Sequence, residues 1–83
     1  MTFRLVYTER AARDIKALDS ATKGRVGRAL RRLEQDPGRN SKRLTQPALG
    51  TYRFRVGDYR VIFDIVGSDL VILRVGHRGT IYR

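Results

Sequence analysis

Arginine alternates with apolar residues in the C-terminal half of the chain. Arg53, Arg55 and Arg60 all fall within the stretch Tyr-Arg-Phe-Arg-Val-Gly-Asp-Tyr-Arg-Val-Ile-Phe at residues 52–63. The guanidinium group is permanently charged and binds phosphate oxygens through paired hydrogen bonds, so a cluster of arginines can hold a phosphate and stabilise charge that develops on it. The sequence contains no carboxylate pair suited to acid–base catalysis, no phosphate-binding glycine loop and no nucleophile or metal motif. Anion binding is therefore the chemistry that these residues indicate.

The alternation also predicts the strands that carry these arginines. Residues 52–56 and 59–65 have apolar side chains at every second position, and Gly57-Asp58 between them is typical of a two-residue hairpin loop. This loop pairs Arg55 with Arg60 on one side of the sheet, which also carries Arg53 and which we call the arginine face. The other side is apolar and consists of Tyr52, Phe54, Val56, Tyr59, Val61 and Phe63. Like charges directly opposite each other destabilise a sheet by a few tenths to about 1 kcal/mol, a cost that a bound anion would offset.

The loop before the next predicted strand, residues 70–76, leaves two registers open. A two-residue loop at Gly67-Ser68 would place His77 on the arginine face. It would also direct three aliphatic side chains at alternate positions away from the core: Val71, Leu73 and Val75. A three-residue loop that includes Asp69 keeps them in the core, where each contributes about 1.5–3 kcal/mol, and this register is our prediction.

The predicted register adds basic residues to the arginine face. It places Arg74, and by extension Arg78, beside Arg60, and it leaves His77 off that face unless a bulge intervenes. Histidine is the side chain that ordinarily titrates near neutral pH, and the sequence has one, so His77 is a candidate acid or base.

Two amphipathic helices are predicted in the N-terminal half. Thr8 caps a helix over about residues 9–18, with the apolar stripe Ala11, Ile15 and Leu18. A second helix over about residues 21–35 has the apolar stripe Val26, Ala29, Leu30 and Leu33. Arg25 and Arg28 lie on the surface of this helix outside the apolar stripe, which is basic. This basic surface is either solvated or a contact for RNA or an acidic protein.

These elements define the expected fold class. A strand over residues 3–7 precedes the helices, and residues 38–51 read as an irregular connection to the strands. The order β-α-α-β-β-β predicts an α+β fold in which the two helices pack on one face of a mainly antiparallel four-stranded sheet. We expect residues 1–83 to form a single domain, because the chain is too short for two.

Composition limits the partners and the compartment. The chain has 18 basic residues, of which 15 are arginine, against 8 acidic ones, so its net charge is +10 and a polyanionic partner is expected. With no cysteine and one histidine, a disulfide scaffold or a Cys- or His-built metal site is not expected. No apolar run is long enough to span a membrane and no signal peptide is evident, so we expect a cytoplasmic protein that does not bind membranes.

Residues 52–63, together with Val-Gly-His-Arg-Gly-Thr-Ile-Tyr at residues 75–82, closely resemble the RelE group of the RelE/ParE toxin superfamily. Near the N-terminus the resemblance continues at Ala12, Asp14, Ile15 and Leu18. It therefore covers essentially the whole chain. It implies a RelE-like fold and a toxin that a cognate antitoxin neutralises.

The resemblance also implies an activity. RelE-like toxins enter the ribosomal A site and cut mRNA without metal or cofactor: the 2′-OH attacks the adjacent 3′ phosphate and leaves a 2′,3′-cyclic phosphate and a 5′-OH. The resemblance assigns the catalytic roles to Arg53, Arg55, Arg60, Arg78 and Tyr82. Further RNA contacts are expected from Arg25, Arg28 and Arg74. Arginine is a poor general base, so the acid and base stay open with His77 as one candidate, and Tyr82 could stack on a base, align the 2′-OH or simply pack.

The expected partners are a cognate antitoxin, the ribosome with its rRNA, and mRNA. The complex with the antitoxin could bind operator DNA through the antitoxin. The main alternative is a ParE-like toxin that inhibits DNA gyrase without nuclease activity. A third is a degenerate member that acts only as an antitoxin-bound component of a DNA-binding complex. The arginine constellation favours the nuclease, because a gyrase inhibitor has no need of it.

Overall fold

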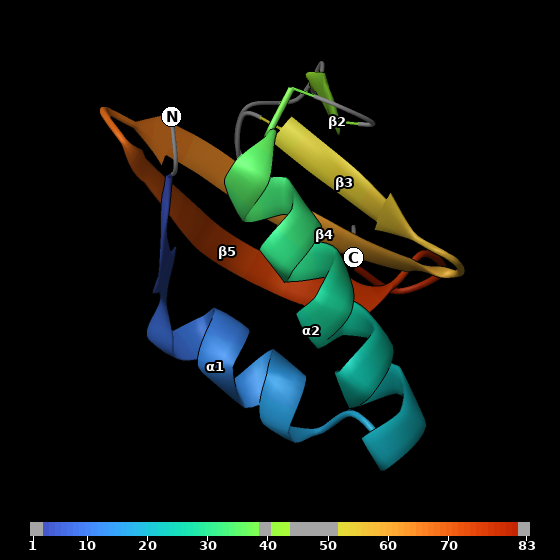
Figure 1. Cartoon of the computed structure of the whole chain (residues 1–83). Helices are drawn as coiled ribbons and strands as arrows, with labels where there is room; N and C mark the ends of the chain where they lie inside the picture. Colours follow the sequence, from blue (N-terminus) through green and yellow to red (C-terminus); the bar gives the residue numbers. More distant parts are fainter. Residues whose placement is uncertain (1–2, 39–40, 44–51, 82–83) are drawn as a thin grey trace.

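A mixed five-stranded sheet with two helices on one face forms the framework of the molecule (Figure 1). The computed structural model describes residues 3–38, 41–43 and 52–81. The elements in chain order are β1 (Arg4–Tyr7), α1 (Glu9–Lys16), α2 (Ser20–Gln35), β2 (Ser41–Arg43), β3 (Tyr52–Val56), β4 (Tyr59–Val66) and β5 (Asp69–His77). In space the strands follow the order β1-β5-β4-β3-β2. The predicted α+β class, the two helices on one face and the four predicted strands are all confirmed.

The sheet extends by one strand beyond the prediction. β2 pairs antiparallel with β3, from Ser41 opposite Phe54 to Arg43 opposite Tyr52. These residues belong to the region that was expected to be an irregular connection, and that expectation was wrong for residues 41–43. β3 therefore has a neighbour on both sides, which makes the strand that carries Arg53 an internal one.

Side-chain caps start both helices. The Thr8 side chain accepts a hydrogen bond from Ala11 N at 3.1 Å, as predicted for α1. Asp19, which was not assigned from the sequence, accepts one from Thr22 N at 2.7 Å and caps α2. Hydrogen bonds from Thr22 hold the pKa of Asp19 below its ordinary value.

The core lies between the helices and one face of the sheet. All four predicted stripe residues of α2 are buried, as is Ala11 of α1, while Ile15 and Leu18 pack against the cluster from its border. The strand residues buried with them are Phe54, Val56, Val61, Phe63, Leu70, Ile72 and Val75. Because side chains alternate along a strand, this packing directs the arginine face away from the helices.

The hairpin of β3 and β4 has the predicted register. Val56 pairs with Tyr59 across the two-residue loop, and Arg55 pairs directly with Arg60. Gly57 has a φ of 59°, in the left-handed region that suits glycine in such a turn.

The hairpin of β4 and β5 differs from the prediction. Val66 pairs with Asp69, so the loop has two residues and not three, with Gly67 at a φ of 61°. Leu73 is then an extra residue in β5, because Phe63 pairs with Ile72 and Ile62 with Arg74. This β-bulge shifts the alternation by one residue, so the core receives Leu70 and Ile72 before it and Val75 after it.

The bulge restores the expected pairing for the rest of β5. Beyond it Val61 pairs with Val75, Arg60 with Gly76 and Tyr59 with His77. This is the register that the three-residue loop had predicted for the same residues. The prediction that Val71 and Leu73 enter the core was wrong, since both are only half-buried.

β1 covers only the first part of β5. It runs parallel to β5, and its last residue Tyr7 lies opposite Ile72. The backbone of β5 after Ile72 therefore needs another partner, and α1, which follows directly, lies along it. No helix among the described residues is both long and apolar enough to cross a bilayer.

Candidate functional site

The arginine face carries both charged and apolar side chains. Arg53 and Arg60 are half-buried and Arg55 is exposed. Ile62 is on the same face and is fully buried, although it does not belong to the core cluster under the helices. Ile81 also lies on this face: a Cβ added to Gly76, the cross-strand partner of Arg60, would come within 3.5 Å of it.

The loop between β3 and β4 gathers further arginines. Arg60 donates from Nη1 to the carbonyl oxygens of Gly57 and Tyr59, both at 3.0 Å. Arg78 donates its backbone N–H to the Asp58 carbonyl at 2.8 Å. Arg25 reaches the same loop from α2, since its Nη1 is 3.7 Å from where a Cβ of Gly57 would lie. With Arg55 opposite Arg60, this end of the sheet concentrates positive charge.

Not all of these charges are neutralised within the protein. The Arg78 Nε and Asp58 Oδ1 atoms are 3.9 Å apart and both side chains are exposed, so this pair contributes little. The guanidinium groups of Arg53 and Arg55 form no ion pair or side-chain hydrogen bond with any residue that the structure describes. No described side chain therefore competes with an external anion for these two groups.

Arg74 has a different environment. It lies opposite Ile62 on the arginine face, where it was predicted, but its Nε donates to Asp14 Oδ2 at 2.8 Å. The same oxygen accepts the backbone N–H of Val75 at 3.0 Å, on the part of β5 that β1 leaves uncovered. Both side chains of the ion pair are largely buried, with 24% and 14% of their surface exposed. Arg74 therefore joins β5 to α1. The prediction that Arg74 contacts RNA did not include this role.

These contacts favour the ionised form of Asp14. Partial burial raises its pKa, but the Val75 N–H, the Arg74 guanidinium and the charge of Arg10 together outweigh burial, and the pKa of Asp14 lies below its ordinary value. Arg10 is the weaker partner, at 3.5 Å from Oδ1 and exposed. Sequence reasoning assigned Asp14 no structural role, because its partners lie 60 and 61 residues away.

His77 lies off the arginine face, as the predicted register had it. It pairs with Tyr59, and the two rings meet edge to face with their centroids 5.5 Å apart. Its Nδ1 accepts the backbone N–H of Gly79 at 3.1 Å. Tyr82 lies outside the described residues. The described part of the chain contains no group of three or more His, Asp or Glu side chains that could hold a metal ion.

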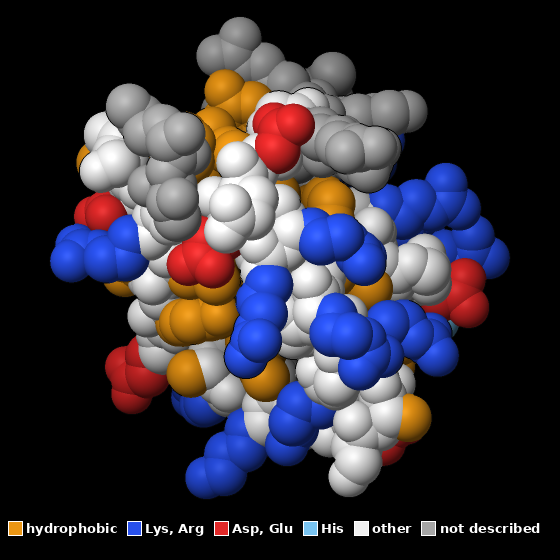
Figure 2. All heavy atoms as spheres, in the orientation of Figure 1, with side chains coloured by type: hydrophobic (Ala, Val, Ile, Leu, Met, Phe, Trp, Pro, Cys, Tyr) orange, Lys and Arg blue, Asp and Glu red, His pale blue; other side chains and the backbone are white. Residues whose placement is uncertain are grey.

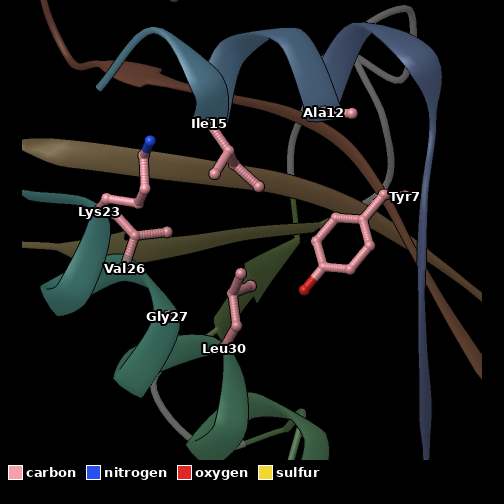
Figure 3. Close-up of a pocket in the computed structure, with 7 residues that line it drawn as sticks. All are labelled: Tyr7, Ala12, Ile15, Lys23, Val26, Gly27 and Leu30. Carbon is pink, nitrogen blue, oxygen red and sulfur yellow. The ribbon is translucent and has the colours of Figure 1, made fainter. Parts of the chain in front are cut away.

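A groove separates the two helices. It has a volume of about 400 Å³ and is lined by Tyr7, Ala12, Ile15, Lys23, Val26, Gly27 and Leu30. The Tyr7 ring extends from β1 into the space between α1 and α2, with Ile15 and Leu30 on the facing sides (Figure 3). Burial, with the negative charge of Glu34, raises the pKa of Tyr7. Apart from Lys23 and the Tyr7 hydroxyl, the side chains that line the groove are apolar.

Basic side chains of α2 lie along one side of this groove. Figure 2 shows the face that the helices cover, where lysine and arginine side chains gather over and around α2. The exposed residues of α2 include Arg25, Arg28, Arg31 and Arg32. The molecule therefore presents positive charge on both sides of the sheet.

Comparison with known proteins shows the family to which this chain belongs. Residues 5–82 match the family described as ParE toxin of type II toxin-antitoxin system, parDE. The chain is also 35% identical to Toxin RelG of Mycobacterium tuberculosis over 86 residues, which cover all of this chain and 99% of that protein. The chain belongs to the RelE/ParE toxin superfamily. It is a toxin of a type II toxin–antitoxin system, of the RelE family.

Solved structures of toxin–antitoxin complexes share the fold of this toxin. The complex RelBE2 from Mycobacterium tuberculosis matches with a TM-score of 0.83 and 32% identity, covering 94% of this chain and all of the other. The RelE–RelB complex from Pyrococcus horikoshii OT3 matches with a TM-score of 0.79 and 28% identity, covering 96% and 99% of the two chains. The resemblance read from the sequence is confirmed at the level of family and fold.

Proposed function

We propose that this toxin is a ribosome-dependent mRNA endoribonuclease that stops translation in the cytoplasm. The observation that carries the proposal is the pair Arg55 and Arg60, opposite each other on the sheet face that points away from both described helices. Arg53, Arg78 and Arg25 add charge around this pair. A like-charge pair on an open face is unfavourable in the free protein and becomes favourable once a phosphate lies between the two groups.

The proposed reaction transfers a phosphoryl group within the RNA. The 2′-oxygen forms a bond to the adjacent phosphorus as its proton leaves, and the bond from phosphorus to the 5′-oxygen breaks as that oxygen gains a proton. The products are a 2′,3′-cyclic phosphate and a 5′-OH, with no metal ion in the scheme. Negative charge grows on the phosphoryl oxygens, where Arg53, Arg55 and Arg60 would stabilise it.

The remaining site residues have supporting roles in this proposal. Because arginine stays protonated in proteins, the arginines bind the phosphate and do not remove the proton. Tyr82 would stack on a displaced base or align the 2′-OH. Arg28, on the exposed surface of α2, would contact rRNA. We assign Arg74 a smaller part in RNA binding, since Asp14 already holds its guanidinium group.

A second function has one observation in its favour, the match to the ParE family description over residues 5–82. A ParE-like toxin would inhibit DNA gyrase and leave RNA intact. The arginine face supports the nuclease instead, because protein binding alone does not need Arg55 opposite Arg60.

One experiment separates the two functions. The toxin is induced without antitoxin in growing cells, mRNA 5′ ends are mapped, and plasmid supercoiling is measured in the same cultures. We expect cuts in phase with codons, absent with Arg60→Ala, and unchanged supercoiling. Intact mRNA with loss of negative supercoiling would show that the toxin inhibits DNA gyrase instead. Cleavage of naked RNA by the purified toxin would contradict ribosome dependence.

We also propose that the antitoxin is an acidic or amphipathic protein with a segment that lies in the groove between α1 and α2. The groove offers apolar contacts, and the basic residues of α2 around it would attract a negatively charged segment. A complex of this kind could bind operator DNA through the antitoxin.

The groove proposal predicts an effect of Ala12→Glu on antitoxin binding. Ala12 is exposed and lines the groove, so a glutamate there places bulk and negative charge against the acidic segment. We expect binding to the purified cognate antitoxin to weaken about tenfold or more, measured by calorimetry. Ala21→Glu, at an exposed position of α2 outside the groove, is the matched control and should bind normally. Equal binding by both variants would show that the antitoxin does not use the groove.

A further inference from the structure

His77 organises the turn that follows β5. Its Nδ1 accepts the N–H of Gly79 at 3.1 Å, and its carbonyl oxygen accepts the N–H groups of Thr80 and Ile81, both at 3.0 Å. The Thr80 hydroxyl adds a longer contact to the same carbonyl at 3.4 Å. One residue thus supplies, from its ring and its carbonyl, the acceptors for three consecutive backbone N–H groups.

This turn determines where the end of the described chain lies. Arg78 is within it, and its backbone N–H is bound to the Asp58 carbonyl in the loop between β3 and β4. Ile81 ends the turn, buried on the arginine face against Gly76. The turn therefore carries the chain from the side of His77 around the end of β5 to the arginine face, with Arg78 beside the clustered arginines.

The contact with Gly79 defines the state of the His77 ring. A backbone N–H can only donate, so the Nδ1 atom that faces it must present a lone pair. The proton of the neutral ring is therefore on Nε2. A doubly protonated ring would direct a second N–H at the N–H of Gly79 and lose the bond. The approach is close, because a Cβ on Gly79 would lie 3.3 Å from Nδ1.

We propose that His77 is a positioning residue of the cleavage reaction: its ring, which accepts the Gly79 N–H at Nδ1, caps the C-terminal turn and so holds Arg78 at the arginine face. The inference rests on the proposed nuclease function. It replaces the role of acid or base that the sequence suggested for His77. The ring lies on the Tyr59 side of the sheet, away from the phosphate that the arginines would bind.

Three substitutions distinguish a cap from a proton-transfer group. Asparagine places its Oδ1 where histidine has Nδ1, and it readily accepts from the N–H two residues ahead. Glutamine places its polar atoms nearer to the position of Nε2, and alanine has none. None of the three retains the ring contact with Tyr59, so they differ chiefly in the bond to Gly79.

Cleavage of mRNA in a reconstituted translation reaction is the first measurement. We expect His77→Asn to retain activity within about threefold of the parent toxin, and His77→Gln and His77→Ala to lose about tenfold or more through misplacement of Arg78. Thermal unfolding of each variant shows that it is folded. If His77→Asn is as inactive as His77→Ala, the bond to Gly79 is not what activity requires and the proposal is overturned.

The second measurement does not depend on nuclease activity. The chain has one histidine, so long-range proton–nitrogen NMR correlations of the intact toxin report His77 directly. At mildly alkaline pH we expect a protonated Nε2 and a bare Nδ1. A protonated Nδ1, or a mixture of the two tautomers, would overturn the cap. A toxin that shows the expected tautomer but cuts no mRNA would instead disprove the proposed function.

Discussion

Replacing Arg55 by alanine is expected to lower mRNA cleavage by about 100-fold or more while leaving the folded state as stable as before. The loss follows from the proposed reaction, in which Arg55 would face the phosphate and stabilise charge that grows in the transition state. Stability should hold or rise by a few tenths of a kcal/mol, because the guanidinium has no partner among the described residues and lies opposite Arg60. Codon-phased cleavage and urea unfolding of the same preparation measure both effects.

Two further variants serve as comparisons for Arg55→Ala. Arg60→Ala should lose cleavage to a similar extent but also about 1 kcal/mol of stability, since Arg60 donates to the carbonyls of Gly57 and Tyr59. Arg13→Ala removes an exposed arginine of α1 and should change neither quantity. Full cleavage by Arg55→Ala would remove Arg55 from the site. A stability loss above about 1 kcal/mol would show that its charge serves the fold.

Asp14→Ala is expected to produce the largest loss of stability among the polar substitutions considered, about 2–3 kcal/mol. One oxygen of Asp14 accepts from both Arg74 and the backbone of Val75. Its removal leaves a buried guanidinium without its counterion and an N–H of β5 without an acceptor. Urea unfolding at neutral pH measures the change in the free energy of unfolding. Arg10→Ala, which removes only the exposed partner of Asp14, is the matched control and should cost about 0.5 kcal/mol or less.

The same contact has a pH dependence of known sign. The folded pKa of Asp14 lies below the unfolded value, so the folded state favours the ionised form. Its contribution is complete above about pH 5 and is lost as the pH falls through the folded pKa. The difference in stability between the parent toxin and Asp14→Asn should therefore shrink on acidification. Asp19, whose pKa is also lowered, is present in both proteins and cancels from the difference. A difference that is constant with pH would show that the Asp14 charge contributes nothing.

Local patterns were sufficient for much of the fold. The apolar stripes of both helices and the alternation of residues 52–63 predicted which faces are buried, because helical and strand periodicities are properties of neighbouring residues. The loop at Gly57-Asp58 then determined the pairing of Arg55 with Arg60, since a two-residue loop permits one register. The central part of the candidate site followed from these two facts.

The second hairpin was harder for a specific physical reason. Residues 70–73, Leu-Val-Ile-Leu, are all apolar, so the sequence does not show which of them face the core. Packing against the helices selected Leu70 and Ile72, and the bulge at Leu73 then brought Val75 into the core as well. A regular strand can direct either Leu70 and Ile72 or Val75 toward the helices, but not all three. Both registers considered from the sequence assumed a regular strand, so neither matched the structure.

Local alternation predicted a basic sheet face opposite an apolar one, with Arg53, Arg55 and Arg60 together on it. Which basic residues are paired within the protein depends on the tertiary structure. Arg74 is bound to Asp14, whereas Arg53 and Arg55 have no side-chain partner among the described residues. Side-chain alternation is a local property of the chain, but an ion pair depends on how segments far apart in sequence meet once the core has formed.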